Sequence, residues 1–100
     1  MGLDYESVKS VNESLIYASV TGFPENTELA NKSAFDLTVQ AMTGFMHITG
    51  EADGPPTKVG YAIVDVLTGQ HITSGILASI LHRERTADPA RNFQGEGQHV

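Results

Sequence analysis

One aspartate stands alone in an apolar part of the sequence. Asp65, in KVGYAIVDVLTGQ (58–70), is the only charged residue between Val59 and Gln70. Burying an isolated carboxylate is costly unless it is hydrogen-bonded, paired with a cation or used in chemistry. A carboxylate at the start of a helix is favoured as the anion and is available as a nucleophile near neutral pH. Asp65 is therefore the first candidate for a catalytic residue.

Asp65 also has a plain structural explanation. It stands where a short extended segment (58–64) should end and a helix should begin, so its carboxylate could cap the N–H groups near Leu67 and Thr68. N–H groups exposed at the same helix start could instead hold an oxyanion or a phosphate oxygen. Position alone leaves the cap and the nucleophile both open, and one residue can serve as both.

Two predicted helices must position Asp65. Isoleucines at every fourth position from Ile72 predict a helix that begins near Asp65 and carries Arg83 and Arg85 in its last turn. Gly69, Gly75 and Ala78 are small enough to allow another backbone to approach it closely. An earlier stripe at i, i+4, i+7 and i+11 predicts a helix through Phe35, Val39, Met42 and Met46. GEADGPP (50–56) must turn the chain between the two.

The remaining segments indicate an α/β fold. DYESVKSVN (4–12) is typical of a short surface helix capped by Asp4, and the apolar run LIYASV (15–20) favours a buried strand of a parallel sheet. His99 and Val100 could begin a further strand. The order helix, strand, loop, helix, turn, strand, helix is an α/β arrangement within one unit (1–100). Such a sheet is thin, which suggests a piece of a larger domain.

Composition excludes several functions. The net charge is −6, which argues against a nucleic-acid partner and against binding to an anionic membrane surface. No run approaches 18 consecutive apolar residues, so no membrane-spanning segment is expected. The first residues do not have the pattern of a signal peptide, and a cytoplasmic or mitochondrial location is expected. There is no cysteine, and the four histidines lack zinc-like spacing, so no metal site is predicted.

Three stretches carry a family resemblance over nearly the whole chain. LIYASVTGF, AFDLTVQAMTGFMHITGEADGPPTKVGYAIVDVLTG and GILASILHRERT resemble the class III family of acyl-CoA transferases, which includes formyl-CoA and carnitine CoA-transferases. The likeness is strongest to members that move CoA between dicarboxylic acids. It implies a Rossmann-like large domain of short parallel strands with packed helices, of which these residues form a central part.

The resemblance implies a role for Asp65 as the nucleophile. In the family, the aspartate at this place carries CoA as an aspartyl-CoA thioester during transfer between an acyl-CoA and a carboxylic acid. CoA thioester is then a substrate, and no permanently bound cofactor is needed. Covalent catalysis of this kind requires a site that largely excludes water.

The resemblance also implies roles for three other residues. Phe35 would line the acyl pocket, Asp36 would hold the active-site geometry, and Lys32 resembles a basic residue that contacts CoA. From the residues alone, Phe35 can equally be core, Asp36 a helix cap and Lys32 a solvated surface side chain.

Related α-methylacyl-CoA racemases are the alternative enzyme class. They use a histidine followed by an aspartate where this chain has Phe35 and Asp36. Phenylalanine cannot transfer a proton, so the racemase interpretation lacks its base. A non-catalytic interaction fragment is the alternative outside enzymes.

The chain departs from the family pattern in two loops. PENTELANK (24–32) replaces a glycine-rich loop, and ADPARNFQ (87–94) lies before GEGQHV. The resemblance implies that the family's N-terminal and C-terminal halves lie outside these residues. It also implies an interlocked homodimer for the full-length parent. We expect the 100 residues alone to be inactive.

Overall fold

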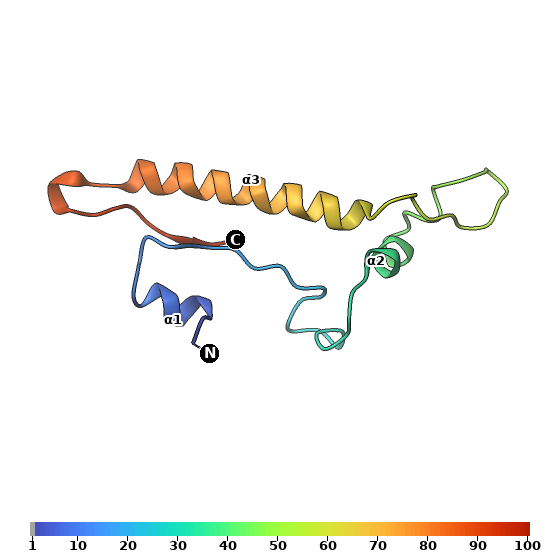
Figure 1. The fold of residues 1–100 in the computed structure, drawn as a ribbon, viewed down its shortest axis with the longest axis horizontal. Coiled ribbons are helices and arrows are strands. Elements are labelled where there is room, and N and C mark those ends of the chain that lie inside the picture. The colour runs from blue at the N-terminus through green and yellow to red at the C-terminus, as the bar shows by residue number, and fades with distance from the viewer. Residues whose placement is uncertain (1) are drawn as a thin grey trace. The chain divides into compact units, whose positions relative to one another are not determined.

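The computed structural model describes residues 2–100, which form two compact units. One unit comprises the residues up to Val20 together with His71–Val100, and the other is Thr21–Gln70. The boundary between them falls within a single long helix, α3 (Ile63–Thr86). Figure 1 shows α3 with the shorter helices α1 and α2.

The first unit is built on a short parallel pair of strands. Helix α1 (Tyr5–Lys9) is capped by Asp4, whose carboxylate accepts the N–H of Ser7, as the sequence predicted. Strand β1 (Ile16–Tyr17) pairs in parallel with β2 (Gln98–His99). The predicted strand at 15–20 is therefore shorter than expected. Its residues are half-buried at most.

The chain returns from α3 to β2 through a tight turn that requires glycine. After the 3₁₀ helix η1 (Pro89–Arg91), Gly95 adopts a φ of 94°, and a Cβ on it would overlap the carbonyl oxygen of Arg83. A Cβ on Gly97 would overlap the carbonyl oxygen of Leu15. Gly95 thus allows the turn to pass close to the end of α3, and Gly97 allows β2 to lie against β1.

The second unit holds α2 (Asp36–Met42) and the first turns of α3. Helix α2 ends at Met42 and not at Met46, and the following residues to Gly50 form turns in which Gly44 and Gly50 have positive φ. The predicted extended segment at 58–64 is not a strand. Residues 55–59 lack regular structure, and α3 begins at Ile63, two residues before Asp65.

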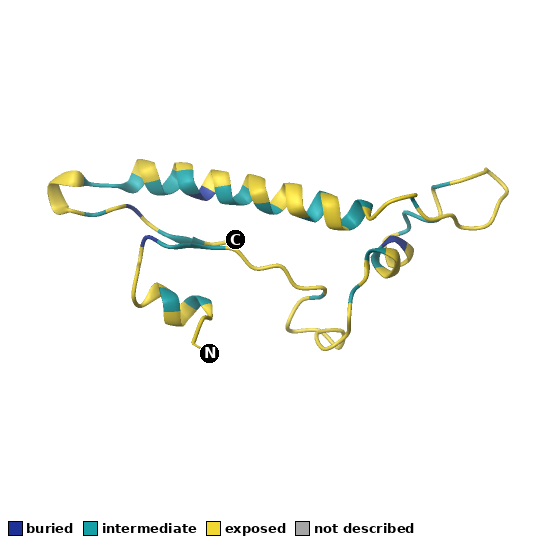
Figure 2. Ribbon diagram, viewed as in Figure 1, coloured by how far each residue is buried: buried dark blue, intermediate teal, exposed yellow. Residues whose placement is uncertain are grey.

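No hydrophobic side chain among residues 2–100 is buried. The buried side chains are Ser14, Gln40 and Ser79. Figure 2 shows long exposed stretches in the loops, and exposed and intermediate residues alternating along α3. Large apolar side chains are open to solvent, including Phe35 (70% exposed) and Leu77 (61% exposed). An α/β arrangement is present, but the described residues do not supply an apolar core for it.

Helix α3 also meets a simple criterion for a membrane span. Its most apolar 18-residue window has a mean hydropathy of 1.2, so by length and composition it could cross a bilayer. This differs from the sequence-based expectation, which required an uninterrupted apolar run. One such helix is weak evidence, since a helix from the core of a soluble protein passes the same test.

Candidate functional site

The N-terminus of α3 is capped by a side chain from α2. The Oδ1 atom of Asp36 accepts the N–H of Val64 at 2.6 Å and the N–H of Asp65 at 3.2 Å. These two N–H groups have no partner inside α3, because the first four donors of a helix lie ahead of its hydrogen-bond ladder. Asp36 is the first residue of α2, yet it caps the next helix and not its own.

A buried glutamine holds Asp36 in this position. Gln40, 1% exposed, donates from Nε2 to the Oδ2 atom of Asp36 at 2.5 Å. Its Oε1 atom accepts the N–H of Val59 at 2.9 Å. The irregular segment before α3 is therefore tied to α2 by a side chain.

The surroundings of Asp36 favour its ionised form. Its partial desolvation raises the pKa of this carboxyl, but the opposing contributions outweigh it. They are the hydrogen bond from Gln40, the N–H groups of Asp65 and Val64, and the positive charge of Lys58. The net effect holds the pKa of Asp36 below its ordinary value, so Asp36 is an anion at neutral pH.

Asp65 is the third residue of α3, where its carboxylate is exposed. The expectation that it is the N-cap is wrong, since Asp36 occupies that role. The expected apolar, water-excluded neighbourhood is also missing among the described residues. Successive residues of a helix point about 100° apart, so the valines on either side of Asp65 in sequence do not enclose it. The lone charge in an apolar run is tolerated because it faces solvent.

Three of the four predicted site residues meet in one pocket. Asp65, Phe35 and Asp36 line an open pocket of about 500 Å³ within the second unit. The other residues that line it are Leu37, Gln40, Lys58, Val59, Gly60, Tyr61 and Ala62. Lys32 is not among them and is exposed in the loop before α2. Phe35 is 70% exposed, so it is not part of a core among the described residues.

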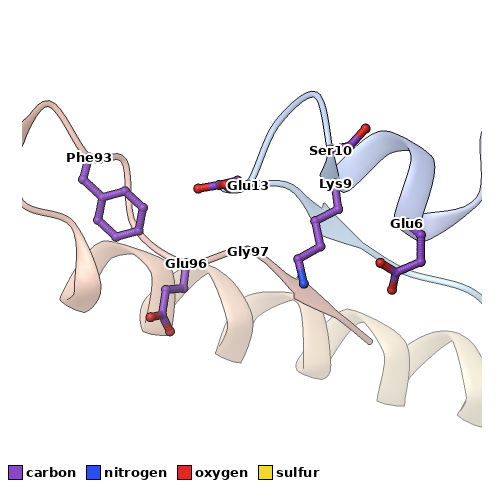
Figure 3. A pocket seen from close by; sticks show the side chains of 7 residues that line it. All are labelled: Glu6, Lys9, Ser10, Glu13, Phe93, Glu96 and Gly97. Atoms are coloured by element: carbon purple, nitrogen blue, oxygen red, sulfur yellow. The ribbon is translucent and has the colours of Figure 1, made fainter.

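A second pocket, of about 530 Å³, lies in the first unit and contains none of the predicted residues. Figure 3 shows its lining of Glu6, Lys9, Ser10, Glu13, Phe93, Glu96 and Gly97. Three carboxylates against one amine would repel a substrate that carries carboxylate or phosphate groups. The pocket at Asp65 carries one carboxylate fewer, with Asp36 and Asp65 against Lys58.

The arrangement at Asp65 is that of a carboxylate presented at a capped helix start beside an open pocket. The family model for CoA-transferase family III matches residues 1–100. The chain belongs to CoA-transferase family III.

Individual relatives in family III match almost the whole chain. The succinate–glutarate CoA-transferase of Agrobacterium fabrum is 46% identical over 99% of this chain and 23% of its own length. The formyl-CoA:oxalate CoA-transferase of Streptomyces coelicolor is 42% identical over 100% of the chain and 22% of its own length. A CaiB/BaiF family protein from Brucella suis has the same fold, with a TM-score of 0.84 at 40% identity, over 99% of this chain and 24% of that one. The chain thus spans about a quarter of the length of these family III proteins.

Two residues of this family III pocket were missed by the sequence-based reasoning. Gln40 lies on the same helix as Asp36, one turn later, and that i, i+4 spacing was a usable signal for a side-chain pair. Lys58 is the first residue of the expected extended segment and gave no signal, because its relation to Asp36 depends on how the turn at 50–56 folds.

Proposed function

We propose that this chain is the segment of a CoA-transferase that carries the nucleophile, and that the nucleophile is Asp65. The full-length enzyme would move coenzyme A between an acyl-CoA and a carboxylic acid, with dicarboxylic acids as the preferred class. The observation that carries the proposal is the pocket in which Asp65, Phe35 and the helix-capping Asp36 come together. The names of the relatives, several of which include succinate, glutarate or oxalate, support the choice of acid.

The reaction consists of balanced acyl and thiol transfers. A carboxylate oxygen of Asp65 attacks the thioester carbonyl, and the carbon–sulfur bond breaks to release CoA thiolate and leave a mixed anhydride. The thiolate attacks the aspartyl carbonyl, which expels the donor acid and forms an aspartyl-CoA thioester. The acceptor carboxylate then attacks this thioester, which expels CoA thiolate and leaves a second mixed anhydride between Asp65 and the acceptor acid. The thiolate attacks the acceptor's carbonyl in that anhydride, which forms the new acyl-CoA and expels the Asp65 carboxylate. Asp65 is regenerated as a carboxylate and the thioester energy is retained.

The neighbouring residues have distinct roles in this proposal. Phe35, exposed at the pocket, would contact the acyl chain, and Asp36 would hold the start of α3 so that Asp65 is presented toward the thioester. Lys32 would contact CoA from the loop before α2, outside the lining of the pocket. The second unit leaves Asp65 exposed, so water exclusion would come from polypeptide beyond these residues or from a partner subunit in a homodimer.

The test uses the full-length enzyme, meaning the complete gene product that carries these residues. A chimera serves as a second test protein: in it, these 100 residues replace the matching segment of the Agrobacterium fabrum enzyme. The enzyme is mixed with succinyl-CoA and glutarate, and the acyl-CoA products are identified by mass. We expect glutaryl-CoA from the parent and none from Asp65→Asn, with both proteins equally folded by circular dichroism. Equal rates for the parent and Asp65→Asn would overturn the proposal.

The racemase alternative is tested in the same mixture. A racemase inverts the α-carbon of its substrate and makes no acyl-CoA of new mass. Phe35 at the position of the racemase base disfavours this chemistry, because its ring cannot accept a proton.

A further inference from the structure

We propose that Gln40 is a positioning residue for the nucleophile, acting on Asp65 through Asp36. This inference rests on the proposed function, since it concerns how the same pocket is held in its reactive geometry. Gln40 is 1% exposed and lines the pocket from α2.

The two hydrogen bonds of Gln40 fix its amide in one orientation. The Asp36 carboxylate can only accept, so it requires the NH₂ end, and the N–H of Val59 can only donate, so it requires the oxygen. A rotated amide would face both partners with the wrong group. Gln40 therefore joins three segments rigidly: α2, the residues before α3, and the start of α3 by way of Asp36.

The bond from Gln40 also decides which oxygen of Asp36 faces α3. Because Oδ2 is occupied by Gln40, Oδ1 remains to accept the N–H groups of Val64 and Asp65. The bond further favours the anionic form of Asp36, which is the form that accepts two N–H groups at a helix start. The placement of the Asp65 backbone thus depends on a neutral donor at position 40.

The inference is tested by a substitution that removes the NH₂ donor of Gln40 and keeps its acceptor oxygen. Gln40→Glu keeps an oxygen for the N–H of Val59 but sets a second carboxylate against Asp36, which is tolerated only when the two share a proton. In the full-length enzyme we expect kcat at pH 8 to fall about tenfold or more with KM for the acyl-CoA little changed. The ratio of the variant's kcat to that of the parent should recover toward one as the pH is lowered to 5.5. Gln40→Leu, which lacks both bonds, should be impaired equally at all these pH values.

A double variant keeps the test meaningful if Gln40→Glu folds poorly. Asp36→Asn with Gln40→Glu reverses the donor and the acceptor, because the asparagine NH₂ can donate to the new carboxylate while its oxygen still faces α3. We expect the double variant to fold and, at pH 8, to have a kcat at least about tenfold higher than that of Gln40→Glu. Its kcat relative to the parent should not rise as the pH is lowered.

Two results would overturn the inference. One is a loss of kcat in Gln40→Glu that is the same fraction of the parent at every pH. The other is a double variant no better than Gln40→Glu. If the aspartyl-CoA intermediate is still found on Asp65 in the parent, either result refutes only the proposed role of Gln40. An intermediate found elsewhere refutes the proposed function instead.

Discussion

The Oδ1 atom of Asp36 accepts the backbone N–H of Asp65 at 3.2 Å, so the carboxylate of Asp36 holds the backbone of Asp65 in place. The two residues are 29 positions apart and belong to different helices. The cap on α3 is therefore also the connection between the acidic residue of α2 and the proposed nucleophile. Several consequences of this relationship can be measured.

Removal of the cap should affect the rate more than the binding of substrate. In the full-length enzyme we expect Asp36→Ala to lower kcat about a hundredfold, because a nucleophile displaced by about 1 Å loses its alignment. KM for the acyl-CoA should change by less than about threefold, and steady-state kinetics measure both values. Asp53→Ala is the matched control, an exposed acidic residue of the same unit outside the pocket. A rise in KM with kcat unchanged would contradict this role for Asp36.

The lowered pKa of Asp36 predicts a pH dependence of stability. A carboxyl whose pKa is lower in the folded state stabilises the fold above its unfolded pKa of about 3.9. That contribution is lost as the pH falls through the folded pKa. The difference in Tm between the parent and Asp36→Ala should therefore be constant above about pH 5 and shrink below about pH 4.

Lys58 provides a control for this pH dependence. Lys58→Ala should raise the pKa of Asp36 and move the loss of stability to higher pH, whereas Lys32→Ala should leave it in place. A Tm difference that grows as the pH falls below 4 would contradict the assignment of Asp36 as an anionic cap.

The parallel pairing of β1 with β2 should depend on Gly97. A methyl group at this position would meet the carbonyl oxygen of Leu15, so Gly97→Ala must break the strand pairing or shift β2. We expect thermal unfolding of the full-length enzyme to show a lower Tm for Gly97→Ala. Gly69→Ala, which meets no atom within 4 Å, is the control. An unchanged Tm for Gly97→Ala would refute the close approach of these strands.

The isolated 100 residues should neither unfold cooperatively nor turn over substrate. No hydrophobic side chain among residues 2–100 is buried, and burial of apolar surface is the main source of stability in a domain. We expect a broad thermal transition by circular dichroism and no glutaryl-CoA from succinyl-CoA and glutarate. Sustained turnover by this chain, in a preparation free of host enzymes, would show this expectation to be wrong.

Local patterns predicted much of the fold. The cap of α1 by Asp4 and the basic last turn of α3 are confirmed, because each depends on residues only a few positions apart. The close backbone approach expected at the small residues of α3 is not seen: the side chain of Val100 lies against Gly75, and nothing lies within 4 Å of a Cβ on Gly69. The strand expected at 58–64 was wrong. Two of its backbone donors, those of Val59 and Val64, bond to side chains of α2, and periodicity within the segment carries no information about these contacts.

In the candidate site, too, the sequence predicted local features but not the contacts between segments that are distant in sequence. Asp65 was found because a single charge in an apolar run is conspicuous, and the resemblance to a family added Phe35 and Asp36. The cap assigned to Asp65 belongs to Asp36, because the turn at 50–56 brings α2 to the start of α3. Only the folded chain reveals that contact. The catalytic role of Asp65 stays a prediction.

One measurement tests the central claim most directly. The full-length enzyme is mixed with succinyl-CoA, treated with borohydride during turnover, digested and analysed by mass spectrometry. Reduction of an aspartyl-CoA thioester converts that side chain to an alcohol. We expect this modification at Asp65, dependent on succinyl-CoA and absent from Asp65→Asn. A modified carboxylate at any other residue, with Asp65 intact, would contradict it.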